Sequence, residues 1–185
     1  TNWYDQSSNS NTARQTTAAN QPKIYDGTTG VVTKNGKAGI VGVSSSSRLS
    51  ISSLMSLTDF SISMVYEEKR YNLMTWGHDS SYYNYHTGGG GRVNGMLNWT
   101  SNIAIGDQGH YFLNRASSSA ELHMNGSSLA TAIYGNTYYF QDLFNAHNNT
   151  FGYTAPIQEF VIWQSDQSAN RTGIETNINT FYNIY

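Results

Sequence analysis

The sequence contains no cysteine. Disulfide bonds, zinc–thiolate sites, iron–sulfur clusters and cysteine nucleophiles are therefore excluded. Charged residues are also scarce, at 12% of 185 residues, which is about half the usual share in globular proteins. The net charge of −2 argues against a broad basic surface, so we expect no nucleic-acid partner. No apolar run approaches the roughly 20 residues of a membrane span, and we expect no membrane insertion.

The polarity of the chain comes instead from uncharged residues. Ser, Thr, Asn and Gln are abundant, with 17 Gly and 14 Tyr, whereas helix-rich domains depend on Glu, Lys, Ala and Leu. Aromatic residues make up 14% of the chain, which argues against disorder. There is no signal-peptide pattern, and the sequence begins at Thr1. We interpret residues 1–185 as one domain, excised from a longer protein or processed from one.

Strand patterns recur at short, regular spacing along the chain. Apolar residues alternate with serine over 60–66, which predicts a half-buried strand, and 71–76 is expected to be its returning partner. Asn35-Gly36 between two apolar runs predicts a hairpin. Further strands are expected at residues 23–25, 82–86, 93–98, 110–115, 121–126, 128–134 and 157–163. Roughly ten to twelve strands of this kind predict a β-sandwich or barrel.

One helix is expected, at the carboxyl end of the chain. Ser165, Asp166 and Ser168 are capping residues, and apolar residues then recur at helical spacing. The apolar side chains that we expect to be buried are Ile174, Ile178, Phe181 and Tyr185, with Asn177 and Asn179 exposed. The helix is predicted to cover one end of the sandwich.

Segments at both ends of the chain resemble a known family. They are Trp3–Asn11, Ala13–Gln15, Gln21–Asp26, Asn35–Ala38, Gln158–Trp163 and Ser165–Arg171. Together they are similar to the concanavalin A-like, laminin G-like jelly-roll domain of bacteriophage tail-fibre and virion structural proteins. One departure is that 7–10 reads Ser-Ser-Asn-Ser where the family has Ser-Gly-Asn-Gly. Because serine tolerates positive φ poorly, the turn differs or Asn9 and Asn11 take the left-handed positions.

The resemblance implies an all-β jelly-roll sandwich of the lectin/glucanase type with one C-terminal α-helix. It also implies a non-catalytic carbohydrate-binding or adhesion module in a phage virion appendage, hence an extracellular location. The implied partners are a host cell-surface glycan and other virion subunits, in a homotrimer. The alternative is a purely structural assembly domain of a fibre or capsid. No cofactor is required, although domains of this fold often hold one Ca²⁺, which leaves Ca²⁺ open.

The carboxylates of the sequence do not form a pattern typical of glycoside hydrolysis. A glycosidase needs two carboxyl groups about 5–10 Å apart, and fold relatives that cut glucans carry Glu-x-Asp-x-x-Glu on one strand. That run is absent: Glu67 and Glu68 are adjacent, while Glu121 and Glu159 stand alone on their expected strands. The Gly-x-Ser-x-Gly elbow and the His-x-x-x-His zinc pattern are also absent. A polysaccharide hydrolase therefore remains only a third alternative.

The metal alternative depends on aspartates in turns. Asp79, Asp107 and Asp166 lie in contexts rich in Asn and Ser, but Ca²⁺ needs six to eight oxygen ligands and no calcium-loop spacing is present. No metal ligand is therefore assigned.

Residues 76–111 contain the candidate ligand site. Flat aromatic rings cover the apolar faces of sugars, and Arg, Asn and His reach their hydroxyl groups. The candidate ligand-binding residues are Trp76, His78, Tyr83, Tyr85, His86, Arg92 and Trp99. Four glycines at 88–91 predict a loop whose backbone approaches a ligand closely. The alternative is that about half of these aromatic rings belong to the core, one of Tyr82 and Tyr83 among them.

Overall fold

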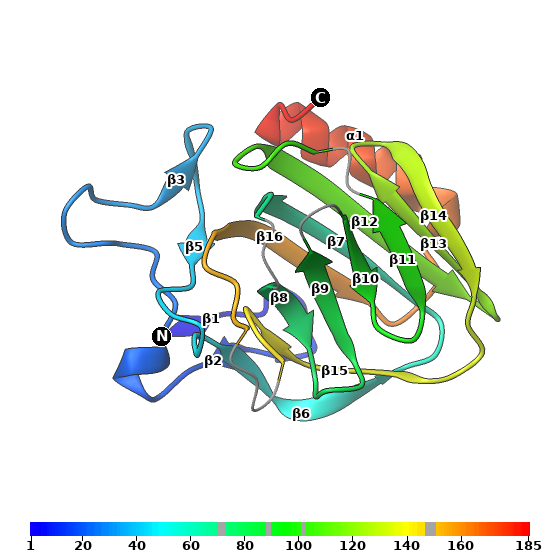
Figure 1. Ribbon diagram of the computed structural model, residues 1–185, viewed down its shortest axis with the longest axis horizontal. Helices are drawn as coiled ribbons and strands as arrows, with labels where there is room; N and C mark the ends of the chain where they lie inside the picture. Colours follow the sequence, from blue (N-terminus) through cyan, green and yellow to red (C-terminus); the bar gives the residue numbers. More distant parts are fainter. Residues whose placement is uncertain (70–72, 88–89, 101–102, 147–150) are drawn as a thin grey trace.

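Two antiparallel sheets pack face to face in the computed structural model, which describes residues 1–69, 73–87, 90–100, 103–146 and 151–185 (Figure 1). One sheet has eight strands and the other six, and a single α-helix follows the last strand. The predicted all-β jelly-roll sandwich with one C-terminal helix is therefore confirmed. The expected turn after Glu67 and the start of the expected strand 71–76 fall partly outside the described residues.

The eight-stranded sheet has the order β1-β2-β6-β15-β8-β9-β10-β11. Its strands are β1 (Asn2–Trp3), β2 (Ala13–Arg14), β6 (Leu49–Leu57), β8 (Leu73–Gly77), β9 (Tyr83–Thr87), β10 (Gly90–Val93), β11 (Leu97–Thr100) and β15 (Tyr138–Leu143). The expected pairing of 71–76 with 60–66 is wrong, because β8 pairs with β15 and β9. Both edges of β7 are already occupied by β12 and β16.

The six-stranded sheet has the order β14-β13-β12-β7-β16-β5. Its strands are β5 (Ile40–Val41), β7 (Phe60–Glu67), β12 (Gln108–Ala116), β13 (Ser119–Met124), β14 (Ser127–Ile133) and β16 (Pro156–Trp163). The predicted Asn-Gly hairpin is confirmed as β3 (Thr33–Lys34) and β4 (Lys37–Ala38), with φ of 49° at Asn35 and 72° at Gly36.

The core lies between the sheets, and β7 is buried on both of its faces. Phe60, Ile62 and Met64 face the core and are fully buried. Ser61 and Ser63 are fully buried on the opposite face, so the prediction of a half-buried strand is wrong. Ser61 donates to Asn114 Oδ1 at 2.5 Å and accepts the backbone N–H of Gln167 at 2.9 Å. The segment that leads into the helix therefore covers this serine face.

The helix α1 (Arg171–Tyr182) directly follows a short 3₁₀ segment, η2 (Ser168–Asn170). The other 3₁₀ segment, η1 (Ala18–Asn20), lies near the start of the chain. The helix α1 packs on the outer face of the six-stranded sheet, where Ile178 and Tyr182 contact Val65. Because Val65 points away from the core between the sheets, α1 covers a sheet face and not the end of the sandwich.

The buried stripe of α1 is rotated from the predicted one. Ile178 is buried, Ile174 is half-buried, and the other buried helix residues are Glu175 and Tyr182. The expected burial of Phe181 and Tyr185 is wrong, since they are 57% and 49% exposed. Of the asparagines, Asn177 is exposed as predicted. Asn179 is half-buried, and its Oδ1 accepts the N–H groups of the two residues after Asn183.

In the N-terminal turn, the left-handed backbone conformation falls on a serine and not on an asparagine. Ser10 takes the left-handed conformation, with φ of 59°, so the expectation for Asn9 and Asn11 is wrong. The Asp5 carboxylate accepts the N–H of Ser7 at 2.8 Å and of Asn11 at 2.7 Å. These two bonds to one carboxylate hold the turn.

Candidate functional site

A row of side chains crosses β9, β10 and β11 on the outer face of the eight-stranded sheet. Arg92 on β10 lies directly opposite Tyr85 on β9 and Asn98 on β11. The neighbours of Arg92 and Asn98 along their strands, including Val93 and Trp99, are buried in the core. Since successive side chains of a strand point to opposite faces, Arg92 and Asn98 point to solvent, and both are exposed. Figure 1 shows the three strands side by side.

A hollow of about 440 Å³ lies beside this row. The residues that line it are Tyr85, Gly90, Gly91, Arg92, Asn98, Trp99 and Thr100. Gly90 is the next residue of β10 on the same face as Arg92, opposite Thr100. Because Gly90 has no side chain, the space between the neighbouring side chains stays empty. The backbone at Gly90 forms the floor of the hollow.

Close packing requires glycine both at position 90, on the outer face, and at position 91, on the core face. A Cβ on Gly90 would overlap the carbonyl oxygen of Trp99. A Cβ on Gly91 would overlap the ring of Trp99 and lie 2.6 Å from the carbonyl oxygen of Tyr85. The expected loop at 88–91 is therefore wrong for Gly90 and Gly91, which belong to β10, while Gly88 and Gly89 lie outside the described residues.

The guanidinium group of Arg92 is held by two tyrosines. Its Nη2 donates to the hydroxyl of Tyr83 at 2.7 Å, and its Cζ lies 5.5 Å from the ring centroids of both Tyr83 and Tyr85. Such cation–π contacts favour a fixed position for the cation. Burial raises the pKa of Tyr85, and the positive charge of Arg92 opposes that shift.

Aromatic surface continues beyond Tyr85. The ring of Phe151 lies 6.4 Å from that of Tyr85 at an interplanar angle of 87°, and Phe151 is 45% exposed. Tyr83 is buried beside Ala146, and Tyr82 is half-buried, so Tyr83 is the buried member of that pair. An apolar rim thus adjoins a polar hollow.

The structure brings some of the predicted site residues together and separates others. Tyr85, Arg92 and Trp99 line the hollow, and Tyr83 supports Arg92. Trp99 is 7% exposed, and its ring lies 5.9 Å from that of Tyr111 in the core. We infer that Trp99 meets the hollow mainly through its backbone.

Trp76 does not belong to a surface site. It is fully buried, and its ring lies 5.7 Å from that of Tyr138 and 6.5 Å from that of Phe160. Its predicted role in ligand binding is therefore wrong. The alternation of the sequence indicated that half of these rings are buried, but it did not indicate which ones.

The two predicted histidines do not line the hollow among the described side chains. His78 lies in the turn between β8 and β9, with Nε2 3.8 Å from Asp79 Oδ2 and its ring 6.5 Å from that of Tyr139. The backbone of His86 pairs with Gly91, but its side chain lies outside the described residues.

Sequence reasoning missed Asn98, Thr100 and Phe151. Asn98 and Thr100 alternate with buried Leu97 and Trp99, and this alternation was a usable signal for two outward-facing polar side chains. Phe151 comes from a distant part of the chain, and its sequence context gave no such signal.

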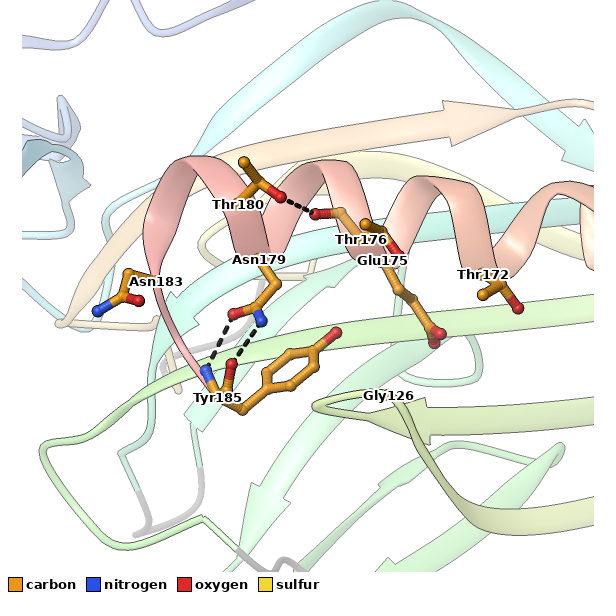
Figure 2. Close-up of a pocket in the computed structure, with 8 residues that line it drawn as sticks. All are labelled: Gly126, Thr172, Glu175, Thr176, Asn179, Thr180, Asn183 and Tyr185. Atoms are coloured by element: carbon orange, nitrogen blue, oxygen red, sulfur yellow. Dashed lines mark hydrogen bonds between the residues drawn. The ribbon is translucent and has the colours of Figure 1, made fainter.

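A second hollow, of about 330 Å³, lies between α1 and the turn that joins β13 to β14 (Figure 2). Glu175 lies at its base, 4% exposed, and accepts a hydrogen bond from Arg171 Nη1 at 2.5 Å. Burial raises the pKa of Glu175, and Arg171 opposes the shift. The ring of Tyr185 lies over Gly126, and Asn179 bonds to the backbone of Tyr185. Much of the polar lining is thus engaged within the protein.

Two of the three aspartates of the calcium alternative accept backbone hydrogen bonds in turns. Asp79 accepts the N–H of Ser81 at 2.7 Å, and Asp166 accepts that of Ser168 at 2.8 Å. Across the described part of the chain, no three His, Cys, Asp or Glu side chains form a group that would hold a metal ion. Within the same residues, no helix has the length and apolar character to cross a membrane.

The fold is similar to those of solved lectin-like proteins. A candidate carbohydrate binding protein from Bacteroides ovatus has a TM-score of 0.52 and 10% identity, over 63% of this chain and 40% of that chain. The heptameric SAP-like pentraxin of Limulus polyphemus has a TM-score of 0.50 and 11% identity, over 75% and 76%. A Trypanosoma rangeli sialidase in complex with the inhibitor DANA has a TM-score of 0.53 and 8% identity, over 78% and 27%.

The chain thus spans 40% of the length of the Bacteroides ovatus protein. No family model and no curated protein matches the sequence. At these low identities, the structural comparisons establish a lectin-like jelly-roll fold and nothing finer.

Proposed function

We propose that this domain is a non-catalytic carbohydrate-binding module and that its ligand lies in the hollow over β9, β10 and β11. The observation that carries the proposal is the solvent-facing row of Tyr85, Arg92 and Asn98 beside a glycine floor. An aromatic ring presents an apolar surface to sugar C–H groups, while guanidinium and amide groups bond to hydroxyls. The similarity in fold to a candidate carbohydrate binding protein supports this assignment.

The absence of catalysis is proposed from the lining of the hollow. None of the described residues that line it is an Asp or Glu. Glycoside hydrolysis by the usual mechanism needs a carboxylic acid and a carboxylate on either side of the scissile bond. Binding without bond cleavage is therefore the expected activity. Release of reducing sugar from a bound polysaccharide would contradict it.

The setting that we propose is a bacteriophage virion appendage, in which the domain recognises a host cell-surface glycan outside the cell. The support is the resemblance of the sequence segments at both ends of the chain to phage tail-fibre and virion domains. Other virion subunits are the proposed protein partners, within a trimer.

A glycan array of bacterial surface polysaccharides tests the function. We expect binding to a limited set of glycans, weakened tenfold or more by Tyr85→Ala. The matched control is Tyr4→Ala, because Tyr4 is 64% exposed and lies on another part of the surface. A folded protein that binds no glycan on a broad array would overturn the proposal.

An assembly role is the second candidate, favoured by apolar side chains on the segment between η1 and β3. Ile24, Tyr25 and Val31 are each more than half exposed there. This segment extends away from the two sheets (Figure 1). Light scattering tests the idea: a stable trimer that Tyr25→Ser dissociates would support assembly through this segment, and a monomer at all concentrations would contradict it.

A further inference from the structure

Arg92 is distinguished from most other described arginines by its charge environment. Three of them form ion pairs with carboxylates: Arg48 with Asp142, Arg115 with Asp59 and Arg171 with Glu175. Among the described residues, Arg92 is in no ion pair, and no Asp or Glu lines the hollow beside it. The hollow is therefore a local positive site on a protein whose net charge is −2.

The guanidinium group is also positioned before any ligand binds. The hydroxyl of Tyr83 accepts one N–H of Arg92, and the ring centroids of Tyr83 and Tyr85 each lie 5.5 Å from its Cζ. A guanidinium group carries five N–H donors, so four remain for a ligand. Because the group is already held, a ligand loses less side-chain entropy when it binds there.

Planar anions match this arrangement better than hydroxyl groups do. Guanidinium and carboxylate groups form two parallel, charge-assisted hydrogen bonds, which give both strength and direction. Asn98, directly opposite Arg92, and Thr100, across from Gly90, supply amide and hydroxyl groups for the rest of a sugar ring. A volume of about 440 Å³ lies within the usual range of small-ligand sites.

We propose that the ligand is an acidic glycan whose sugar carboxylate pairs with Arg92. This inference rests on the proposed carbohydrate-binding function and names its substrate class. The carboxylate belongs to a hexuronic acid or to a nonulosonic acid, since both present the same planar anion.

Matched ligands that differ only in charge test the proposal by calorimetric titration. One pair is tri-galacturonate and its methyl ester, and the other is sialyllactose and its methyl ester. We expect the acidic member of one pair to bind at least tenfold more tightly than the neutral member, with the preference falling as salt rises. The pair that shows the preference identifies the kind of sugar acid.

Two substitutions locate the effect at Arg92. Arg92→Ala is expected to reduce the acidic preference at least tenfold, and Arg14→Ala, at an exposed position on β2, to leave it unchanged. Because Arg92→Ala also removes a bond to Tyr83, Asn98→Asp gives an independent test. It places a carboxylate opposite Arg92 on the exposed face, and is expected to abolish the preference while the melting temperature stays unchanged.

The outcomes separate this inference from the function on which it rests. Equal affinity for both members of each pair, lost in Tyr85→Ala, would overturn the acidic ligand and leave carbohydrate binding intact. A preference for sulfated over carboxylated glycans would also overturn it. No glycan binding at all would overturn both proposals.

Discussion

The stability of this domain is expected to fall in mild acid because of His110. This residue lies on β12, 1% exposed, with Nε2 2.8 Å from Ser63 Oγ. Burial lowers the pKa of His110 from 6.5 to about 4, since the charged imidazolium is poorly solvated there. The unfolded chain takes up a proton below pH 6.5, and the folded protein takes it up only near pH 4. The contribution of His110 to stability is therefore present above pH 6.5 and is lost as the pH falls toward 4.

The magnitude follows from the two pKa values. At about 1.4 kcal/mol for each pH unit, the difference between 6.5 and about 4 corresponds to about 3 kcal/mol of unfolding free energy. Between pH 7 and pH 5 the loss is about 2 kcal/mol. That is a substantial part of a total stability of roughly 5–15 kcal/mol.

Two carboxyl groups, one half-buried and one buried, act in the opposite direction. Burial raises the pKa of Glu159 and of Glu175, so both bind protons more readily in the folded state. Their effect favours the folded state as the pH falls, and it partly masks that of His110. The comparison must therefore isolate one residue.

Urea denaturation of the parent protein and His110→Gln at pH 7 and pH 5 makes that comparison. The parent should lose about 2 kcal/mol more than the variant across this range. Asn177→Ala, at an exposed position on α1, is the control and should follow the parent. Parallel losses in the parent and in His110→Gln would refute the reasoning.

Four further substitutions test the packing. Ile178→Ala should cost about 2–5 kcal/mol in chemical denaturation, because the side chain is 4% exposed, whereas Phe181→Ala should cost less than about 1 kcal/mol at 57% exposure. Equal costs would mean that the helix is rotated from its described position. Gly91→Ala should lower the melting temperature and weaken glycan binding together, because the added methyl group overlaps the ring of Trp99. An unchanged melting temperature would contradict that contact. Trp76→Ala should cost about 3–5 kcal/mol of unfolding free energy, since the ring is fully buried. A marginal cost would mean that the ring is not buried in the core.

Regular alternation and turn chemistry made part of the fold predictable. Strands β13 and β14 were located because Asn125-Gly126 marks the turn between them, and β16 because its sequence is a largely apolar run. Strand β6 was missed because its buried ends, Leu49 and Leu57, are separated by exposed residues that break the alternation. Strand β15 was missed because a register shift between Phe140 and Asp142 interrupts it and because Asp142 is buried.

For the helix, the sequence predicted that α1 forms but not which of its faces is buried. Ile178 belongs to both the predicted stripe and the observed one. The observed stripe includes Glu175, which is buried beside Arg171, and Tyr182, which is hydrogen-bonded to Glu159. A polar residue that is buried through its partner cannot be recognised by hydrophobic spacing alone.

The candidate site was predictable as a region but not as a set of side chains. Tyr85 and Arg92 come together because they occupy opposite positions on paired strands, a relation that depends on register. Alternation assigns Trp99 and Asn98 to opposite faces, but only the packing of the two sheets decides which face is the core.

The central claim is that a glycan binds over β9, β10 and β11. Its most direct test is a nuclear magnetic resonance titration of isotope-labelled protein with the best glycan from the array. We predict that amide shift changes concentrate at Tyr85, at residues 90–92 and at residues 98–100. Changes concentrated instead along α1 and the β13–β14 turn, or on the segment between η1 and β3, would contradict the claim.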